Sequence, residues 1–168
     1  MDESAATTAM ARPRARAAPG RRAVAAVPHG HWQVTTMVAA LGLGGVVAAL
    51  TYPGAADADV FATFAGVVLG PALRPGDVVV LDNLAAHKDD RVREAVEARG
   101  AVLLFLPPYS PDLNPIEKAW SKVKAYLRAR AARTPLALGY AIAEALDRIT
   151  AEDCRGYFAS CGLPGSLH

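Results

Sequence analysis

The chain has 168 residues, which is enough for one domain with a sizeable core. Apolar residues make up 52% and charged residues 20% of the sequence, so the composition excludes a wholly disordered protein. The formal net charge is only +2, but residues 4–56 contain five arginines and no acid, and residues 118–133 contain six basic residues and no acid. Two basic blocks in a nearly neutral chain indicate a polyanionic partner.

The cysteine content and the longest uncharged run exclude several classes of protein. Cys154 and Cys161 are too few for a zinc site or a disulfide framework, so we expect small buried side chains in a reducing compartment. Residues 34–52 are uncharged, but their apolar part is shorter than the ~20 residues that a membrane-spanning helix needs. No basic leader precedes Asp2 and Glu3, so no secretory signal is expected. The sequence predicts a soluble protein with no membrane partner.

The first predicted elements are a long loop, a hairpin and a helix. Residues 5–30 are rich in Ala, Arg, Pro and Gly, which is typical of a basic loop. Residues 34–40 and 46–52 are rich in β-branched and apolar residues around a glycine turn, which predicts a β-hairpin. Asp57 or Asp59 is expected to cap a helix. Its buried face should hold Val60, Phe64, Val67 and Val68.

Two short apolar runs follow, at residues 77–81 and 101–106. Continuous apolar runs of this length are typical of strands that are buried on both faces. A helix is predicted between them, over residues 89–99, with Val92 and Val96 one turn apart. This alternation of strand, helix and strand predicts an α/β fold with some parallel pairing.

The last third of the chain predicts three helices. Asn114 is a good N-cap and Pro115 suits the first helical position, so a helix begins there. Its buried stripe is predicted to be Ile116, Trp120, Val123 and Leu127. A second helix begins at Thr134, with Leu138, Ile142, Leu146 and Ile149 on one side. Thr150 and Asp153 predict a capping box for a final helix that ends near residue 162.

Two carboxylates are placed where a site would form. Asp82 stands at the C-terminal end of a predicted strand, and Glu117 stands in the first turn of a predicted helix, with 34 residues between them. Paired carboxylates near basic residues suit divalent-metal binding and displacement at a phosphate. Each carboxylate also has a purely structural explanation. Asp82 could form the turn after the strand, and Glu117 could complete a capping box with Asn114.

The sequences of two loops resemble motifs of a known family. Leu81-Asp-Asn-Leu-Ala-Ala-His87 and Leu106-Pro-Pro-Tyr-Ser-Pro-Asp-Leu-Asn-Pro-Ile-Glu-Lys-Ala-Trp120, with Lys124, closely resemble the DDE transposases of bacterial insertion sequences in the Tc1/mariner superfamily. The separation of 34 residues matches the spacing between the second and third catalytic acids of that group. The similarity covers essentially all of residues 1–168.

The resemblance implies a fold, a function and a metal site. It implies an α/β, ribonuclease-H-like mixed sheet flanked by helices, and metal-dependent DNA cleavage and strand transfer at insertion-sequence ends. Asp2, in an Asp-Glu-Ser context, would be the first catalytic acid, and with Asp82 and Glu117 it would hold two Mg²⁺ (or Mn²⁺) ions. If Asp2 is not the first acid, Asp57 and Asp59 are the alternatives.

The resemblance and the basic blocks together give candidate DNA contacts. Near the carboxylates these are Asn83, His87, Tyr109, Ser110, Lys118, Lys122 and Lys124, and in the basic loop they are Arg12, Arg14, Arg16, Arg21 and Arg22. The ordinary alternatives are packing for the loop residues, a solvated helix face for the lysines and a disordered tail for the arginines. For His87 the alternative is a plain residue at the start of a helix.

The beginning of the chain departs from the family pattern. Only Met1 precedes Asp2, so the strand that should lead into Asp2 is predicted to be truncated, and no upstream helix-turn-helix region is present. We interpret residues 1–168 as the catalytic domain of a longer, cytoplasmic bacterial transposase from a split frame or a decayed element. Its expected partners are transposon-end and target DNA, a second copy in a homodimer, and an upstream transposase polypeptide or region. A non-catalytic DNA-binding remnant and another ribonuclease-H-like nuclease remain as alternatives.

Overall fold

A central antiparallel sheet organises the protein. The computed structural model describes residues 1–163, apart from the side chains at positions 85 and 86. Strands β1 (Asp2–Thr7), β2 (Val34–Gly42) and β3 (Gly45–Pro53) lie in that order and pair antiparallel, with Asp2 opposite Ala39 and Thr7 opposite Val34. The predicted hairpin is therefore confirmed.

A second, parallel pair of strands extends this arrangement. Strands β4 (Val78–Leu81) and β5 (Val102–Phe105) pair in parallel, with Val78 opposite Val102, as the alternation in the sequence predicts. The amino group of Met1 donates a hydrogen bond of 2.8 Å to the Val80 carbonyl, which brings the end of β4 beside the start of β1. The ends of these two strands therefore meet, and this is where Asp2 and Asp82 lie.

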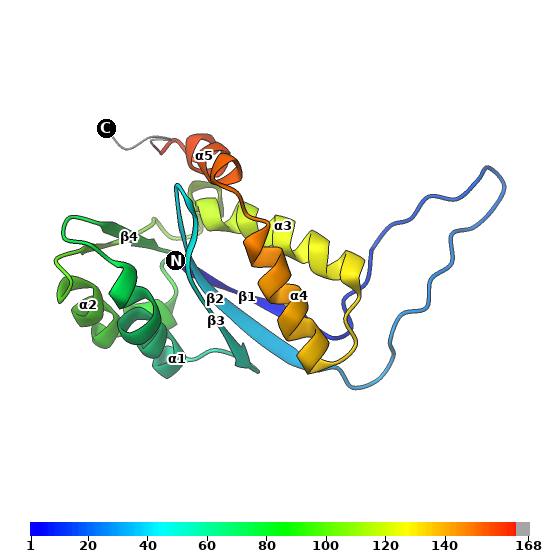
Figure 1. Cartoon of the computed structure of the whole chain (residues 1–168), viewed down its shortest axis with the longest axis horizontal. Helices are drawn as coiled ribbons and strands as arrows, with labels where there is room; N and C mark the ends of the chain where they lie inside the picture. The colour runs from blue at the N-terminus through cyan, green and yellow to red at the C-terminus, as the bar shows by residue number, and fades with distance from the viewer. Residues whose placement is uncertain (164–168) are drawn as a thin grey trace.

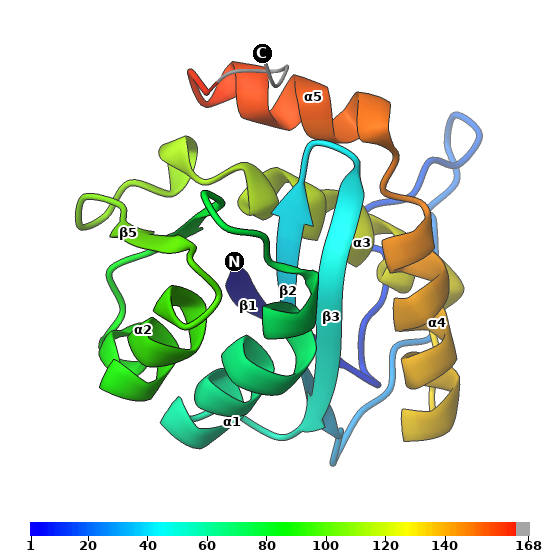
Figure 2. The same ribbon diagram turned by 60° about the vertical axis from the view of Figure 1, so that its left-hand side comes forward.

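Helices cover both faces of the central sheet (Figure 2). On one face lie α3 (Pro115–Arg130), α4 (Pro135–Asp147) and α5 (Ala151–Ser160). On the other lie α1 (Ala58–Thr63), which continues as a π-helix over Phe64–Leu69 and a 3₁₀ turn over Gly70–Ala72, and α2 (Asp90–Glu97). A hydrophobic core lies on each face of the sheet, and the strands contribute alternate side chains to the two cores, because successive residues of a strand point to opposite faces.

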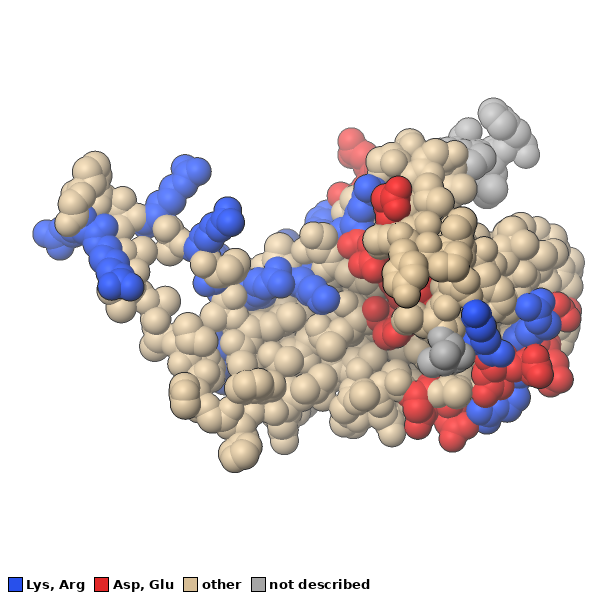
Figure 3. All heavy atoms as spheres, turned by 180° about the vertical axis from the view of Figure 1, so that it is seen from behind, with Lys and Arg blue, Asp and Glu red and all other residues tan. Residues whose placement is uncertain are grey.

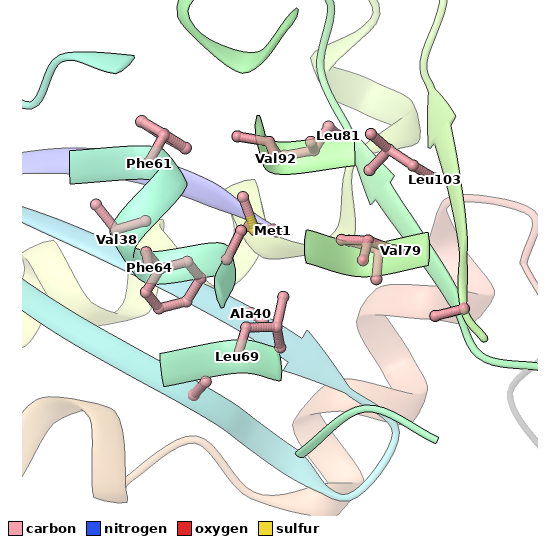
Figure 4. Packing of buried hydrophobic residues seen from close by; sticks show 14 of the residues in the cluster. Met1, Val38, Ala40, Phe61, Phe64, Leu69, Val79, Leu81, Val92 and Leu103 are labelled. Carbon is pink, nitrogen blue, oxygen red and sulfur yellow. The ribbon is translucent and has the colours of Figure 1, made fainter. Parts of the chain in front are cut away.

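The two cores can be followed along β2. Met37 and Ala39 pack with Ile116 and Trp120 of α3, whereas Val38 and Ala40 pack with residues of the α1 segment and of β4. Figure 4 shows the second core, in which Phe61, Phe64 and Leu69 lie over the sheet. The buried stripe predicted for α3 is confirmed, since each of its four side chains is at most 3% exposed.

The first strand corrects one expectation. Residues 5–7 belong to β1 and not to the loop, and Asp2 is the first residue of this strand. Asp2, Ser4 and Ala6 are buried at alternate positions, and all of β1 is paired with β2. Alanine and serine have little strand preference of their own, so the pairing with β2 decides the conformation. Asp2 is therefore held in the fold and is not tethered to a loose terminus.

Two expectations about burial are also wrong. In β4 and β5 the side chains alternate, and Val78, Val102 and Leu104 are about half exposed, so these strands are not buried on both faces. In the α1 segment, Asp57 caps the helix by accepting from the Val60 amide, but Val67 is 70% exposed. The π-helical turn after Thr63 shifts the face, because its hydrogen bonds span five residues instead of four.

The long loop between β1 and β2, residues 8–33, is called the basic arm here. Figure 1 shows it extending from the body beyond α3 and α4. Every residue from 12 to 34 is exposed, and five of them are arginine. The arm is closed at its base by hydrogen bonds between Thr8 and Gln33, and Arg133 donates to the carbonyls of Thr8 and Met10.

Two predicted helix starts are confirmed, since Thr134 caps α4 and Thr150 with Asp153 forms the capping box of α5. Asp89, where the predicted helix over residues 89–99 begins, caps α2. Cys154 and Cys161 are free and buried. Across residues 1–163, none of the helices combines the length and apolar character that a membrane span requires.

Candidate active site

Asp82 lies immediately after β4, at the end of the parallel pair. The Leu84 amide donates to Asp82 Oδ1 at 3.2 Å, which turns the chain sharply away from the strand. The Asp82 side chain is 34% exposed, so one part of it is packed and another part faces solvent. The structure thus gives Asp82 the turn-forming role and still leaves it accessible.

Glu117 is exposed in the first turn of α3. The backbone of Asn114 occupies the N-cap position, but its side chain forms no capping hydrogen bond. The capping box that would explain Glu117 by helix structure alone is therefore not formed, and its carboxylate is not used to begin the helix.

Asp82 and Glu117 line the same hollow, which has a volume of about 400 Å³. The loop that joins β5 to α3 forms one wall and contributes Tyr109 and Ser110, while Asn83 lies beside Asp82. Tyr109 is fully exposed and has a positive φ of 58°, a backbone conformation that is uncommon for any residue except glycine. The structure therefore brings together five residues that the sequence singled out.

Asp2 lies next to this hollow but is buried, with only 4% of the residue exposed. Its Oδ1 accepts from the Glu3 amide at 2.8 Å, and its Oδ2 lies 3.5 Å from the side-chain nitrogen of Asn114. Burial raises the pKa of Asp2 to about 7, and the nearby charges of Glu3 and Glu117 add to this effect. The charges of Asp2 and Asp82 both act on the Met1 amino group and raise its pKa, although burial lowers that pKa overall to about 6.

The three acids fit a divalent cation by their chemistry. Carboxylate oxygens are the ligands that Mg²⁺ and Mn²⁺ prefer, and a buried carboxyl with a raised pKa is stabilised in its charged form by a cation. In the part of the chain that the structure describes, however, no three His, Cys, Asp or Glu side chains are gathered closely enough to hold a metal. A bound ion would therefore have to draw the carboxylates together.

His87 does not lie where a DNA contact requires. Its side chain is fully buried, and its ring centroid lies 4.3 Å from that of Phe61, so the prediction of a direct contact with DNA is wrong. Nε2 lies 2.9 Å from Glu3 Oε2, and Nδ1 is in contact with Asp82 Oδ1. Burial alone would lower the pKa of His87, but the hydrogen bond to Glu3 and the charges of Glu3, Asp82 and Asp2 raise it above its usual range.

Glu3 is the residue at this site that the sequence analysis missed. It appeared there only as the neighbour of Asp2, and its partner His87 is 84 positions away. Alternation in β1 gave a usable signal: a charged side chain between the buried Asp2 and Ser4 must point to the opposite face of the sheet.

The basic candidates differ in how accessible they are. Lys122 is exposed but forms an ion pair of 2.5 Å with Asp153 of α5, so a contact of Lys122 with DNA would compete with this ion pair. Lys118 and Lys124 are half-buried on α3. The five arginines of the arm are all exposed, and Figure 3 shows the blue side chains of the arm separated from the acidic residues of the body.

The alternative first acids have other roles. Asp57 accepts the capping hydrogen bond of α1, and Asp59 pairs at 2.7 Å with Arg91 on the surface. Neither residue is among those that line the hollow beside Asp82 and Glu117.

A protein-family comparison decides the family. The model described as DDE superfamily endonuclease matches residues 1–137, which include all three acids and both motifs. The chain belongs to the DDE superfamily endonucleases. No curated protein sequence matches it significantly.

Solved structures confirm the ribonuclease-H-like fold. The chain is similar to the Mos1 transposase in a paired-end complex with the left transposon end, with a TM-score of 0.75 and 20% identity over 96% of this chain. It is also similar to the Mos1 mariner paired-end complexes with Mn (TM-score 0.74, 20% identity) and with Mg (TM-score 0.70, 18% identity). These matches cover 96% and 95% of this chain. The chain of this DDE endonuclease spans 50–52% of the Mos1 chains.

Proposed function

We propose that this DDE endonuclease is the catalytic domain of a DNA transposase, which cleaves phosphodiester bonds and transfers strands at the ends of a bacterial insertion sequence. The observation that carries this proposal is that Asp82 and Glu117, from two separate elements, line one open hollow beside the buried Asp2. The similarity to Mos1 complexes that contain transposon ends supports DNA as the substrate.

Asp2, Asp82 and Glu117 would hold the divalent ions, two Mg²⁺ or Mn²⁺. When bound, such ions activate a water or 3′-hydroxyl and stabilise the leaving oxygen of the phosphodiester. Both contacts described for Asp82 engage Oδ1, so Oδ2 is the oxygen available for a cation. Glu117 is exposed and lines the hollow, whereas Asp2 would contribute a carboxyl group that the fold has already removed from solvent.

The remaining residues of the hollow would position the DNA. Tyr109, Ser110 and Asn83 line it and can contact sugar and phosphate, and Lys118 and Lys124 lie on the helix that carries Glu117. The arginines of the basic arm would follow the phosphate backbone further away. In this proposal the terminal repeats are read by a region or polypeptide that corresponds to the other half of Mos1, and a second copy completes a homodimer in the bacterial cytoplasm.

Two observations favour a second function. In residues 1–163 the three carboxylates do not form a ready metal cluster, and the basic arm is exposed from residue 12 onward, including all five of its arginines. A non-catalytic protein that binds DNA and interferes with an intact transposase would have these two properties. A ribonuclease-H-like nuclease with a different substrate is distinguished from both by its cleavage products.

The test is metal-dependent cleavage of a labelled duplex that carries the inverted repeat of the element. The protein is assayed with Mn²⁺ or Mg²⁺, with and without the polypeptide encoded upstream. We expect cleavage to require the metal and to be lost in Asp2→Asn, Asp82→Asn and Glu117→Gln, while Asp90→Asn, an exposed acid on α2, retains it. DNA binding without cleavage under all of these conditions would favour the non-catalytic function. Cleavage that persists in Asp82→Asn would contradict the proposed site.

A further inference from the structure

The Glu3–His87 pair behind Asp82 is not explained by the packing of the fold. The three residues come from β1, from the 3₁₀ turn Ala85–Lys88 and from the end of β4. The His87 imidazole lies between the two carboxylates, at 2.9 Å from Glu3 Oε2 on one side and in contact with Asp82 Oδ1 on the other.

His87 is more deeply buried than the two carboxylates that flank it. The His87 side chain is 0% exposed, whereas the Glu3 and Asp82 side chains are 26% and 34% exposed. A polar ring atom without a hydrogen bond is costly to bury, and in the described residues His87 Nδ1 forms no hydrogen bond although it lies against Asp82 Oδ1. The ring packs against Phe61, but both of its nitrogens face carboxylates, which indicates a role beyond packing.

The Glu3 side chain lies on the opposite face of the sheet from Asp2. Its neighbours Asp2 and Ser4 point into the face covered by α3, so Glu3 reaches His87 from the opposite face of the sheet. Asp2 and the Glu3–His87 pair therefore approach the region of Asp82 from different sides, although Asp2 and Glu3 are consecutive in β1.

We propose that Glu3 and His87 form a positioning pair that fixes the orientation of the Asp82 carboxylate. This inference rests on the proposed function, in which Asp82 ligates a divalent ion. His87 and the Leu84 amide both contact Oδ1, so two groups from the neighbouring turn restrain this one oxygen while Oδ2 takes part in neither contact. Partners of ligating side chains typically change metal affinity by about 10–100-fold when they are removed.

Two substitutions at Glu3 separate positioning from charge. Glu3→Gln keeps a side-chain oxygen that can accept from His87 but removes the charge, whereas Glu3→Ala removes both. Glu97→Gln, an exposed acid of α2 that is paired with Arg93, serves as the control for the loss of a remote charge. Each full-length protein is examined for Mn²⁺ affinity by calorimetry, for thermal unfolding, and for the NMR signals of the His87 ring nitrogens and the Asp82 carboxyl carbon without metal.

We expect Glu3→Ala to bind Mn²⁺ about tenfold more weakly, with Glu3→Gln and Glu97→Gln within about threefold of the wild type. In the metal-free protein, Glu3→Ala should shift both the His87 nitrogen and the Asp82 carbon signals, while Glu3→Gln leaves the Asp82 signal near its original position. Equal losses of affinity in Glu3→Gln and Glu3→Ala would overturn the proposal, because charge alone would then account for the effect.

The NMR measurement keeps this inference separate from the proposed function. If the wild type binds no Mn²⁺, the proposed metal site fails, but the response of the Asp82 signal to Glu3→Ala still decides whether Glu3 acts on Asp82 through His87. If that signal does not move in a folded Glu3→Ala protein, the positioning pair is refuted whatever the metal affinity is.

Discussion

The side-chain nitrogen of Asn114 lies 3.5 Å from Oδ2 of Asp2, although 112 positions separate the two residues in the sequence. Asn114 is buried and stands at the N-cap of α3 without using its side chain to cap the helix. Asn114 thus begins α3, the helix that carries Glu117, and also contacts the buried Asp2 of β1. The relative position of α3 and β1 is in this way coupled to the spacing of two of the candidate metal ligands.

Replacement of Asn114 should separate this contact from helix capping. Asn114→Ala leaves the buried Asp2 carboxylate without its amide neighbour, so we expect a loss of about 1–3 kcal/mol in the free energy of unfolding. Asn114→Asp retains a good N-cap residue but brings a second carboxylate to Asp2, so it should be more destabilising at pH 8 than at pH 5. Urea unfolding at both pH values measures this. Equal stability of Asn114→Asp and wild type at pH 8 would show that the contact is unimportant.

The buried Asp2 predicts a defined pH dependence of stability. Its pKa of about 7 in the folded state is above the ordinary value of 3.8, so the folded protein binds more protons in this range and loses stability as the pH rises through it. A shift of this size corresponds to at most about 4 kcal/mol. Without metal, Asp2→Asn should therefore be more stable than wild type at pH 8, and the difference should shrink by more than half at pH 5. The surface variant Asp59→Asn should show no such trend.

The Met1 amino group should give a pH dependence of the opposite sign. Burial lowers its pKa from 8.0 to about 6, so the folded state binds fewer protons between these values and gains stability as the pH rises. One glycine added before Met1 replaces the buried amine by a peptide N–H that can still donate to Val80. We expect this extension to stabilise the protein by about 2–3 kcal/mol at pH 5 and by much less at pH 9. A gain that is independent of pH would contradict the burial of this group.

Binding of the protein to DNA should depend strongly on salt and weakly on sequence. Replacement of the five arm arginines by alanine should reduce the slope of log affinity against log salt by about 4–5, whereas replacement by lysine should restore most of it. The affinities for terminal-repeat and scrambled duplexes should differ by less than about tenfold, because positively charged groups that contact phosphate do not read bases. A stronger preference for the repeat would place sequence recognition within this chain.

Lys122 should contribute to the stability of the protein and not to its affinity for DNA. Its partner Asp153 is also the acid of the α5 capping box, so Asp153→Ala removes an ion pair and a cap together, whereas Lys122→Met removes the ion pair alone. We expect losses of about 0.5–1 kcal/mol for Lys122→Met and a larger loss for Asp153→Ala. Affinity for duplex DNA should change less than twofold in Lys122→Met, in contrast to Lys118→Met and Lys124→Met.

Local patterns predicted the elements whose signals are contained within one segment. The stripe from Ile116 to Leu127, the caps at Asp57, Thr134 and Thr150, and the hairpin turn depend on neighbours within a few positions. The strand β1 was missed because alanine and serine carry little preference, and its conformation is set by β2, some thirty residues later.

The site shows the same division. Asp82 and Glu117 were found because each stands at the end or the beginning of an element, where a side chain is accessible. The pairing of Glu3 with His87 and the contact of Asn114 with Asp2 were not found, since they depend on how distant segments pack. The ion pair of Lys122 was missed for the same reason: its partner lies 31 positions away on another helix.

Because the basic arm is closed at its base, its length can vary without affecting the rest of the fold. Thr8 and Gln33 join the two ends directly beside the first pair of β1 and β2, so residues added or removed beyond this point leave the strand register unchanged. The entropy of closing a loop grows only slowly with its length, and a doubling costs about 0.6 kcal/mol. The length and the charge of the arm can therefore change without altering how β1 pairs with β2, so the arm is free to vary independently of the sheet that carries Asp2.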